Sequence, residues 1–304
     1  MQKFNRNYII NFTFESGALS FSISRPLTIE FDINRQDYAS CNYASIRLIN
    51  LSQQHRNKLE HDIINTNEGS AINVELQAGY GNGPTFPVIF KGNVQKGYSH
   101  REGTRFVTTL ECYDAGIGLQ TGWSMHQIAA GTLMTDVFKL LIADLLPYGI
   151  VQGPISPGPV PGSTTWGVVS KGFGIDGPTR DVLSQLTNSN FYVDNGVAII
   201  CPPGFATGPQ INPPVINAQS GLLSTPFTQQ SIIDFEMIFE PTLKVGDTIN
   251  LQSSTANSAV NGFHQIIGIN HRGVISDAVA GTATTRLRCR GGVFQGLLAN
   301  TGAV

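Results

Sequence analysis

The strand pattern of the first third of this chain returns in its last third. Residues 29–33 are IEFDI and residues 233–237 are IDFEM, so apolar and acidic side chains alternate in the same way in both segments. An Ile-x-Leu segment follows each of them by about 16 residues, at 46–48 and at 249–251. Alternation with a period of two is typical of a strand that has one face on a core. The chain is therefore expected to form two related β-rich halves.

Two further segments match in the same order. A strand ends in His-Arg at 100–101 and again at 271–272, which makes His100 and His271 candidate equivalents. The Thr-rich strand that follows ends as TLEC at 109–112 and as RLRC at 286–289. Strands of unrelated sheets also alternate, so any two matches alone would be weak. Four matches in the same order indicate a duplicated unit. Three such chains around an axis would present six similar units.

The segment between the two halves has a different pattern. Apolar residues at helical spacing predict a helix over 132–146, and Pro178 is well placed in the first turn of a second helix. The strands that flank Asp-Asn-Gly at 194–196 predict a hairpin with a tight turn. The low-complexity run GPISPGPVPGS at 153–163 is expected to be an extended loop or linker, unable to pack as helix or sheet.

A short helix is inserted in the first half. Ser52 is a good N-cap for the segment QQHRNKLEHDII, in which Leu59 and Ile63 share one face. The glycine-rich string at 79–83 lacks the Lys-Ser/Thr of a nucleotide-binding loop and is expected to be a hairpin turn.

These patterns predict a mainly β fold, that is, a β-rich α+β fold. We expect two related β-barrel domains with a small α+β module between them. The expected boundaries are 1–122 for the first barrel with its inserted short helix, 123–204 for the α+β middle module and 205–304 for the second barrel. The 33 glycines and 16 prolines suit short strands joined by tight turns.

Charge and hydropathy exclude several classes of partner. Only 13% of residues are charged, the net charge is −2 and the cations are scattered, so no basic stripe supports sequence-specific nucleic-acid binding. A low surface charge suits a protein that neighbouring subunits partly cover. The start MQKFNRNYIINF lacks the features of a secretory signal, and no apolar run of about 18 residues could span a membrane. We expect a protein that is made in the cytoplasm and does not bind membranes.

Candidate reactive residues do not converge on a catalytic or metal-binding pattern. The cysteines Cys41, Cys112, Cys201 and Cys289 form no CxxC pair and are expected to be buried thiols. His55 and His61 are six residues apart, which places them on different faces of a helix. His126 and His264 complete the set of six histidines. We therefore predict no catalytic, cofactor-binding or metal-binding residues, no cofactor and no enzymatic activity.

The acidic residues of the repeated strands form pairs at i and i+2. Glu30 and Asp32 share one face of a strand, as do Asp234 and Glu236. Adjacent acids on one strand are poorly placed to act across a substrate, so a solvated or lumen-facing sheet surface is the favoured interpretation. In a pore, such acids would repel DNA phosphates.

Several segments resemble a known family. The stretch PLTIEFDINRQDYASCNYASIRLINLSQQHRNKL at 26–59, AGYG at 78–81 and IFKGNV at 89–94 resemble the N-terminal, tail-tube-type barrel of baseplate hub proteins from contractile-tailed bacteriophages. The segments GLLSTPFTQQSIIDFEMIFEPTLKVGDTINLQS at 221–253 and NGFHQIIGINHRG at 261–273 resemble the second barrel of the same proteins. The resemblance is loosest over 153–170 and carries no catalytic motif.

The resemblance implies a structural subunit of the virion. Its expected form is a homotrimeric ring in the phage tail baseplate, assembled in the host cytoplasm, that adapts the sixfold tail tube to the threefold central spike. The ring would enclose a lumen for DNA passage during genome ejection. The implied partners are the spike protein, the tail tube or tube-initiator protein and other baseplate proteins.

Two other classes of function compete with the hub. A tail-associated carbohydrate- or protein-binding β module, an adhesin, would need exposed aromatic side chains on one loop face, and the two tryptophans are Trp123 and Trp166. A hydrolase would need a convergent set of acid, base and nucleophile, which the sequence does not show. Trimer formation and binding to the spike favour the hub, and a monomer that binds glycans favours the adhesin.

Overall fold

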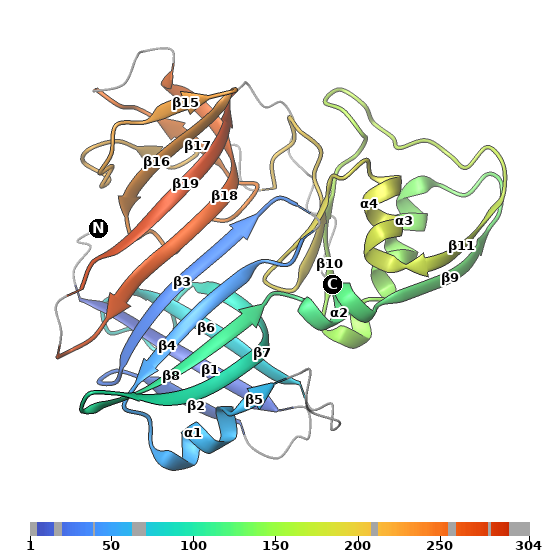
Figure 1. Ribbon diagram of the computed structural model, residues 1–304. Helices are drawn as coiled ribbons and strands as arrows, with labels where there is room; N and C mark the ends of the chain where they lie inside the picture. Colours follow the sequence, from blue (N-terminus) through green and yellow to red (C-terminus); the bar gives the residue numbers. More distant parts are fainter. Residues whose placement is uncertain are drawn as a thin grey trace.

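The computed structural model describes residues 5–14, 20–38, 40–62, 71–207, 212–254, 260–278 and 281–291. Within these ranges one 14-stranded sheet contains the strands of the first and last thirds of the chain, and sheets of three and two strands form the middle. The predicted mainly β fold is confirmed. In Figure 1 the first half is blue to teal, the middle is green to yellow and the second half is orange to red.

The first half is a run of antiparallel strands in the order β3-β4-β8-β7-β6-β1-β2. Its inward side chains form a buried cluster that includes Tyr8, Phe12 and Phe90. The elements are β1 Arg6–Phe14, β2 Phe21–Ser24, β3 Thr28–Gln36, β4 Tyr43–Ile49, α1 Gln53–Leu59, β5 His61–Asp62, β6 Ile72–Tyr80, β7 Val88–Glu102 and β8 Arg105–Tyr113.

The inserted helix α1 is shorter than predicted. The Ser52 side chain caps it by accepting a hydrogen bond from the His55 amide at 3.3 Å, as expected. The helix ends at Leu59, because the next residues form β5 and pair with β7. Ile63 lies outside the described residues. The expected hairpin turn is confirmed, since Gly81 adopts a φ of 86° between β6 and β7.

The middle segment packs two helices against small sheets over a second buried cluster. The predicted hairpin is confirmed: β12 and β13 are antiparallel, and Asn195 and Gly196 both have positive φ in the turn between them. The elements are α2 Gly116–Thr121, β9 Trp123–Ile128, α3 Met134–Ala143, η1 Leu146–Tyr148, β10 Val151–Ile155, β11 Phe173–Pro178, α4 Thr179–Leu186, β12 Phe191–Asp194 and β13 Val197–Ile200.

The low-complexity run does not lie wholly in a loop. Residues up to Ile155 belong to β10, which pairs in parallel with β13. A Cβ on Gly153 would lie 2.4 Å from a methyl carbon of Val197, so only glycine lets the two strands approach this closely. The backbone carbonyl of Ser156 accepts a hydrogen bond from the Trp166 indole at 2.8 Å. The prediction that this run cannot join a sheet was therefore wrong for its first residues.

The second half encloses a third buried cluster, to which Tyr192 and Ile199 of the middle segment also contribute. Its elements are β14 Val215–Ile216, β15 Phe227–Gln229, β16 Ile232–Ile238, β17 Thr248–Leu251, β18 Gly262–Ile275 and β19 Ala283–Gly291.

The duplication is visible in the strand order. The order β3-β4-β8-β7-β6 of the first half corresponds to β15-β16-β19-β18-β17 in the second. Cys112 pairs with Val94 and Cys289 pairs with Ile266, and in both halves the register shifts by one residue directly after that pair. A shared bulge at one position of one strand pair is a specific local feature. The two halves are therefore copies of one unit, as predicted.

Two of the four predicted matches join strands that are not equivalent. β16 pairs with β19 as β4 pairs with β8, so residues 233–237 correspond to 44–48 and not to 29–33. β17 pairs with β18 as β6 pairs with β7, so residues 249–251 correspond to 74–76 and not to 46–48. Strands that place one face on the same core share the same alternation, so the sequence pattern did not distinguish them.

The predicted equivalence of His100 and His271 is wrong by one residue. In the register counted from the shared cysteines, His100 corresponds to Arg272, and His271 corresponds to Ser99. Successive side chains of a strand point to opposite faces, so this shift separates the two histidines. The His100 side chain is 41% exposed and interacts with Glu102, whereas His271 is fully buried.

The two halves meet along one strand junction. β3 of the first half pairs antiparallel with β18 of the second over eight residue pairs, from Ile29 with Ile275 to Gln36 with Gly268. Figure 1 shows these two strands side by side at the centre of the sheet. Phe239 of the second half lies in the core of the first, where its ring contacts those of Phe31 and Tyr80. The halves therefore share a sheet and part of a core.

Candidate functional site: the polar face of the shared sheet

The side of the large sheet that faces away from the two cores carries polar and charged side chains across the junction. We call this surface the polar face. Direct cross-strand pairing places its members on the same side, and two surface hollows lie among them. The members are Glu30, Asp32, Asn34, Ser45, Arg47, Asp234, Glu236, Asn270, Arg272, Arg286 and Arg288.

The acids that the sequence places on this face are matched by arginines. The Arg47 guanidinium contacts Glu30 at 2.6 Å, and Arg272 lies 4.0 Å from Asp32. Asp234 lies 3.6 Å from Arg288, which the adjacent strand carries. The predicted placement of both acid pairs on one sheet surface is confirmed. The surface is not of one sign, however, so repulsion of phosphate by acids alone does not describe it.

A buried ion pair joins the middle segment to β3, at the edge of this face. The Arg35 guanidinium, at the end of β3, donates to both carboxylate oxygens of Asp194 at 2.7 and 2.5 Å. Their side chains are 1% and 6% exposed. The Asn42 amide nitrogen donates to the Val193 carbonyl at 3.0 Å and adds to the same contact. A two-pronged arginine–carboxylate contact fixes orientation as well as distance.

Asp114 completes this cluster at the end of β8. Its carboxylate accepts hydrogen bonds from the backbone amides of Asn195 and Gly196, the two turn residues of the β12–β13 hairpin. Burial, together with the nearby Asp194, raises the pKa of the Asp114 carboxyl to about 7 against the opposing effect of the amide hydrogen bonds. The hairpin turn is therefore held by side chains of the first half.

Asp37 gives the junction a pH-dependent stability. It follows β3, and its amide donates to the Ile267 carbonyl of β18 at 3.0 Å. Burial raises the pKa of its carboxyl to about 6, although the nearby Arg290 opposes this shift. An aspartate in an unfolded chain has a pKa of about 4. A carboxyl with a raised pKa in the folded state destabilises the fold once ionised, so stability falls as pH rises from about 4 to about 6.

We expect Asp37→Asn to remove this dependence. Between pH 4 and pH 7, the free energy of unfolding of the original chain should fall by on the order of 2 kcal/mol more than that of the variant. Urea denaturation at both pH values measures the difference. Asp136→Asn, at a carboxylate that is 53% exposed, is the matched control and should follow the original chain. Parallel pH profiles for the original chain and Asp37→Asn would refute the assignment.

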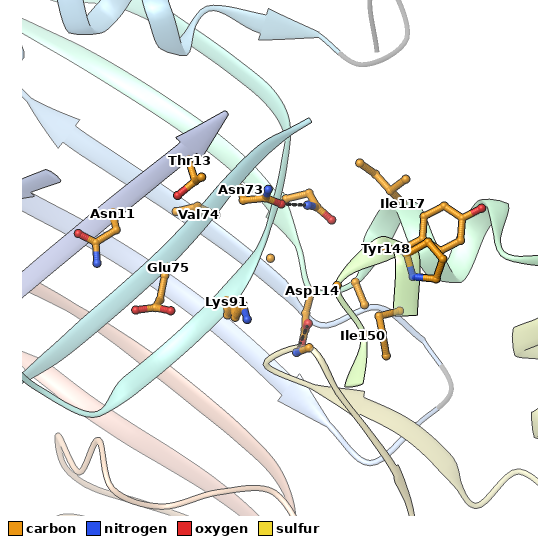
Figure 2. A pocket seen from close by; sticks show the side chains of 16 residues that line it. Asn11, Thr13, Asn73, Val74, Glu75, Lys91, Asp114, Ile117, Tyr148 and Ile150 are labelled. Carbon is orange, nitrogen blue, oxygen red and sulfur yellow. Dashed lines mark hydrogen bonds between the residues drawn. The ribbon is translucent and has the colours of Figure 1, made fainter. Parts of the chain in front are cut away.

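A cleft of about 400 Å³ separates the first half from the middle segment. Figure 2 shows Asn73 and Glu75 on one side of it and Tyr148 and Ile150 on the other. Glu75 already accepts a hydrogen bond from Gln77, and Asp114 is held by backbone amides. Among the described residues, the lining of this cleft contains no histidine, cysteine or serine.

The histidines lie apart from one another. His55 stacks on Phe21 with ring centroids 4.4 Å apart, and His126 contacts Asp144 at 2.8 Å. The Nδ1 atom of His271 lies 2.9 Å from the Thr285 hydroxyl, and burial lowers the pKa of this imidazole to about 3. His264 contacts a backbone carbonyl. In the part of the chain that the structure describes, no three His, Cys, Asp or Glu residues are grouped as metal ligands.

The four cysteines are free thiols. Three of them are buried, as predicted, while Cys41 is only partly buried. Burial raises the pKa of the Cys201 thiol to about 12, which keeps it protonated. No helix in the described ranges is long and apolar enough to cross a membrane.

The buried ion pair was missed at the level of sequence, although a signal for it was present. Residues 29, 31 and 33 of β3 point into the core, and the same period of two places Arg35 inward. A charged residue at an inward position requires a partner of opposite charge. The identity of that partner could not be foreseen, because Asp194 is 159 residues away in the chain.

The fold is similar to that of several solved tail proteins. No family model and no curated protein matches the sequence, but solved structures match the fold over nearly the whole chain. The 43 kDa tail protein of prophage MuSo2 from Shewanella oneidensis matches with a TM-score of 0.57 and 10% identity, over 92% of this chain and 95% of the other.

Two further solved structures share this fold. A tail protein from Neisseria meningitidis matches with a TM-score of 0.55 and 10% identity, over 94% of this chain and 97% of the other. A type VI secretion system component from E. coli is described as structurally similar to bacteriophage tail proteins. It matches with a TM-score of 0.50 and 7% identity, over 93% of this chain and 80% of the other. The resemblance to phage tail proteins is thus confirmed at the level of the fold.

Proposed function

We propose that this chain is a structural subunit of a phage tail baseplate hub. Three copies would form a ring that adapts a sixfold tail tube to a threefold central spike, with the polar face toward a lumen through which DNA passes. The observation that carries the proposal is the duplicated strand order, because two like halves per chain give a threefold ring six similar units. The similarity to solved tail proteins supports it.

The charge balance of the polar face suits a passage for DNA. Arginines paired with acids on the same sheet lower the net attraction for phosphate, so DNA would pass without binding tightly. The expected partners are the spike protein, the tail tube or tube-initiator protein and other baseplate proteins. The expected location is the virion tail, after assembly in the host cytoplasm.

Mass photometry of the full chain, alone and with the spike protein of the same particle, tests this proposal. We expect a species of three times the 32.7 kDa chain mass, at least when the spike is present, and co-purification of the two proteins. A chain that stays monomeric and does not bind the spike would contradict the hub.

An adhesin is the second candidate, and one observation favours it. Trp123 and Met125 on β9 are 57% and 74% exposed, so the middle segment presents apolar surface to a partner. A monomer that binds immobilised glycans, and loses that binding in Trp123→Ala, would support the adhesin over the hub.

The hub proposal assigns the chain no catalytic role. Hydrolysis of peptidoglycan by the purified chain would contradict it.

A further inference from the structure

We infer that copies of this chain join edge to edge, residues 98–100 of β7 in one copy pairing antiparallel with β15 of the next. This inference rests on the proposed ring and identifies the contact that closes it. The junction between β3 and β18 within one chain is the template, since it already joins two copies of the repeated unit through a sheet edge.

The counterparts of these two strands in the other half, β7 and β15, each have an edge segment without a strand partner among the described residues. β7 corresponds to β18, and β15 corresponds to β3, in the strand order of the two halves. Among the described residues, β15 pairs with β16 alone. β5 occupies the outer edge of β7 only at Lys96 and Gly97, which leaves the edge from Tyr98 onward without a strand partner in the described residues. One edge of each kind is therefore available per chain.

The repeat fixes the register of the expected contact. Arg272 pairs with Asp32 at the internal junction, and their counterparts are His100 and Phe227. The next pair, His271 with Ile33, has Ser99 and Thr228 as counterparts. By the same rule Tyr98 opposes Gln229. Each copy thus offers β15 to the next copy and receives β15 from the previous one, as in a head-to-tail ring.

Burial at the two sites agrees with this correspondence. His271 and Ile33 are fully buried where the halves meet, whereas Ser99 and Thr228 are exposed. Phe227 is 50% exposed. Unpaired strand edges offer free backbone N–H and C=O groups to which another strand can add. Pairing would bury these side chains as the internal junction buries its own.

The contact between copies is shorter than the internal one, with three expected residue pairs against eight. Short edge strands limit uncontrolled association of monomers. Formation of the ring would then depend on additional contacts, such as those with a spike, or on high concentration.

Disulfide trapping in the full chain tests the register. In a Cys41→Ala background, His100→Cys/Phe227→Cys and Ser99→Cys/Thr228→Cys place thiols on the expected pairs. Adjacent pairs of an antiparallel ladder alternate in spacing, so two pairs are used. The control, His100→Cys/Thr228→Cys, draws one position from each expected pair and places its thiols on opposite faces. Asp32→Cys/Arg272→Cys reports the internal junction and should close within one chain.

We expect covalent dimers and trimers on non-reducing gels from at least one expected pair, formed at least tenfold faster than from the control. Mass photometry of the same samples, with and without spike, reports assembly independently. A trimer without preferential cross-linking of the expected pairs would overturn this strand contact and leave the hub proposal standing. Absence of both trimer and cross-links, with the spike present, would overturn both.

Discussion

Asp194→Ala is expected to destabilise the protein by about 3–5 kcal/mol, because it leaves the Arg35 guanidinium buried without its partner. Arg35 is 1% exposed, and Asp194 supplies both of its charged contacts at 2.7 and 2.5 Å. Removing one member of a buried pair costs far more than the pair contributes, since the remaining charge has lost its water. Urea denaturation followed by circular dichroism measures the change.

The pair joins the first half to the middle segment, so the loss should also be local. Hydrogen exchange is expected to accelerate in the β12–β13 hairpin before it does so in β3 and β4. Asp136→Ala is the matched control, because this carboxylate is 53% exposed and pairs with Lys139 on one helix. It should change stability by less than about 1 kcal/mol. Equal effects of the two substitutions would refute the structural role of the pair.

Phe239→Ala is expected to cost about 3–5 kcal/mol and to loosen the two halves from one another. The Phe239 ring is fully buried, with centroid distances of 5.8 Å to Phe31, 6.1 Å to Tyr80 and 5.5 Å to His271. It belongs to the chain of the second half but packs in the core of the first. A cavity at this position therefore weakens both the core of the first half and its contact with the second half.

Thermal or urea unfolding measures the total loss, and limited proteolysis reports whether the halves separate. Phe263→Ala is the matched control, since Phe263 is 50% exposed and should change stability by less than about 0.5 kcal/mol. If Phe239→Ala unfolds like the control, the shared core is not what holds the halves together.

Much of the local structure follows from residue pattern alone. Alternation over 29–33 and 44–51 predicts strands because the period of a strand is set by backbone geometry and needs no information about neighbours, and β3 and β4 lie there. The Ser52 cap and the Asn195-Gly196 turn are predictable for the same reason, since each is determined within a few residues.

The duplication was detected, but its alignment was only half correct. The segment ending at Cys112 and the one ending at Cys289 were matched properly from their residues, and both cysteines lie at the pair that precedes the same bulge. The match of 29–33 with 233–237 was wrong because strands that neighbour one another in a sheet face the same core and so carry the same pattern.

The sequence by itself determined the strand periods, the turns, the mainly β class and the presence of two related units, all of which depend on residues close together in the chain. Only the tertiary structure decided which strands are equivalent, that β3 joins β18 into one sheet, and that Arg35 meets Asp194. These contacts join residues that are far apart in sequence, and many partners satisfy the same local pattern. The choice among them is made by packing and burial of the whole chain, which no single segment contains.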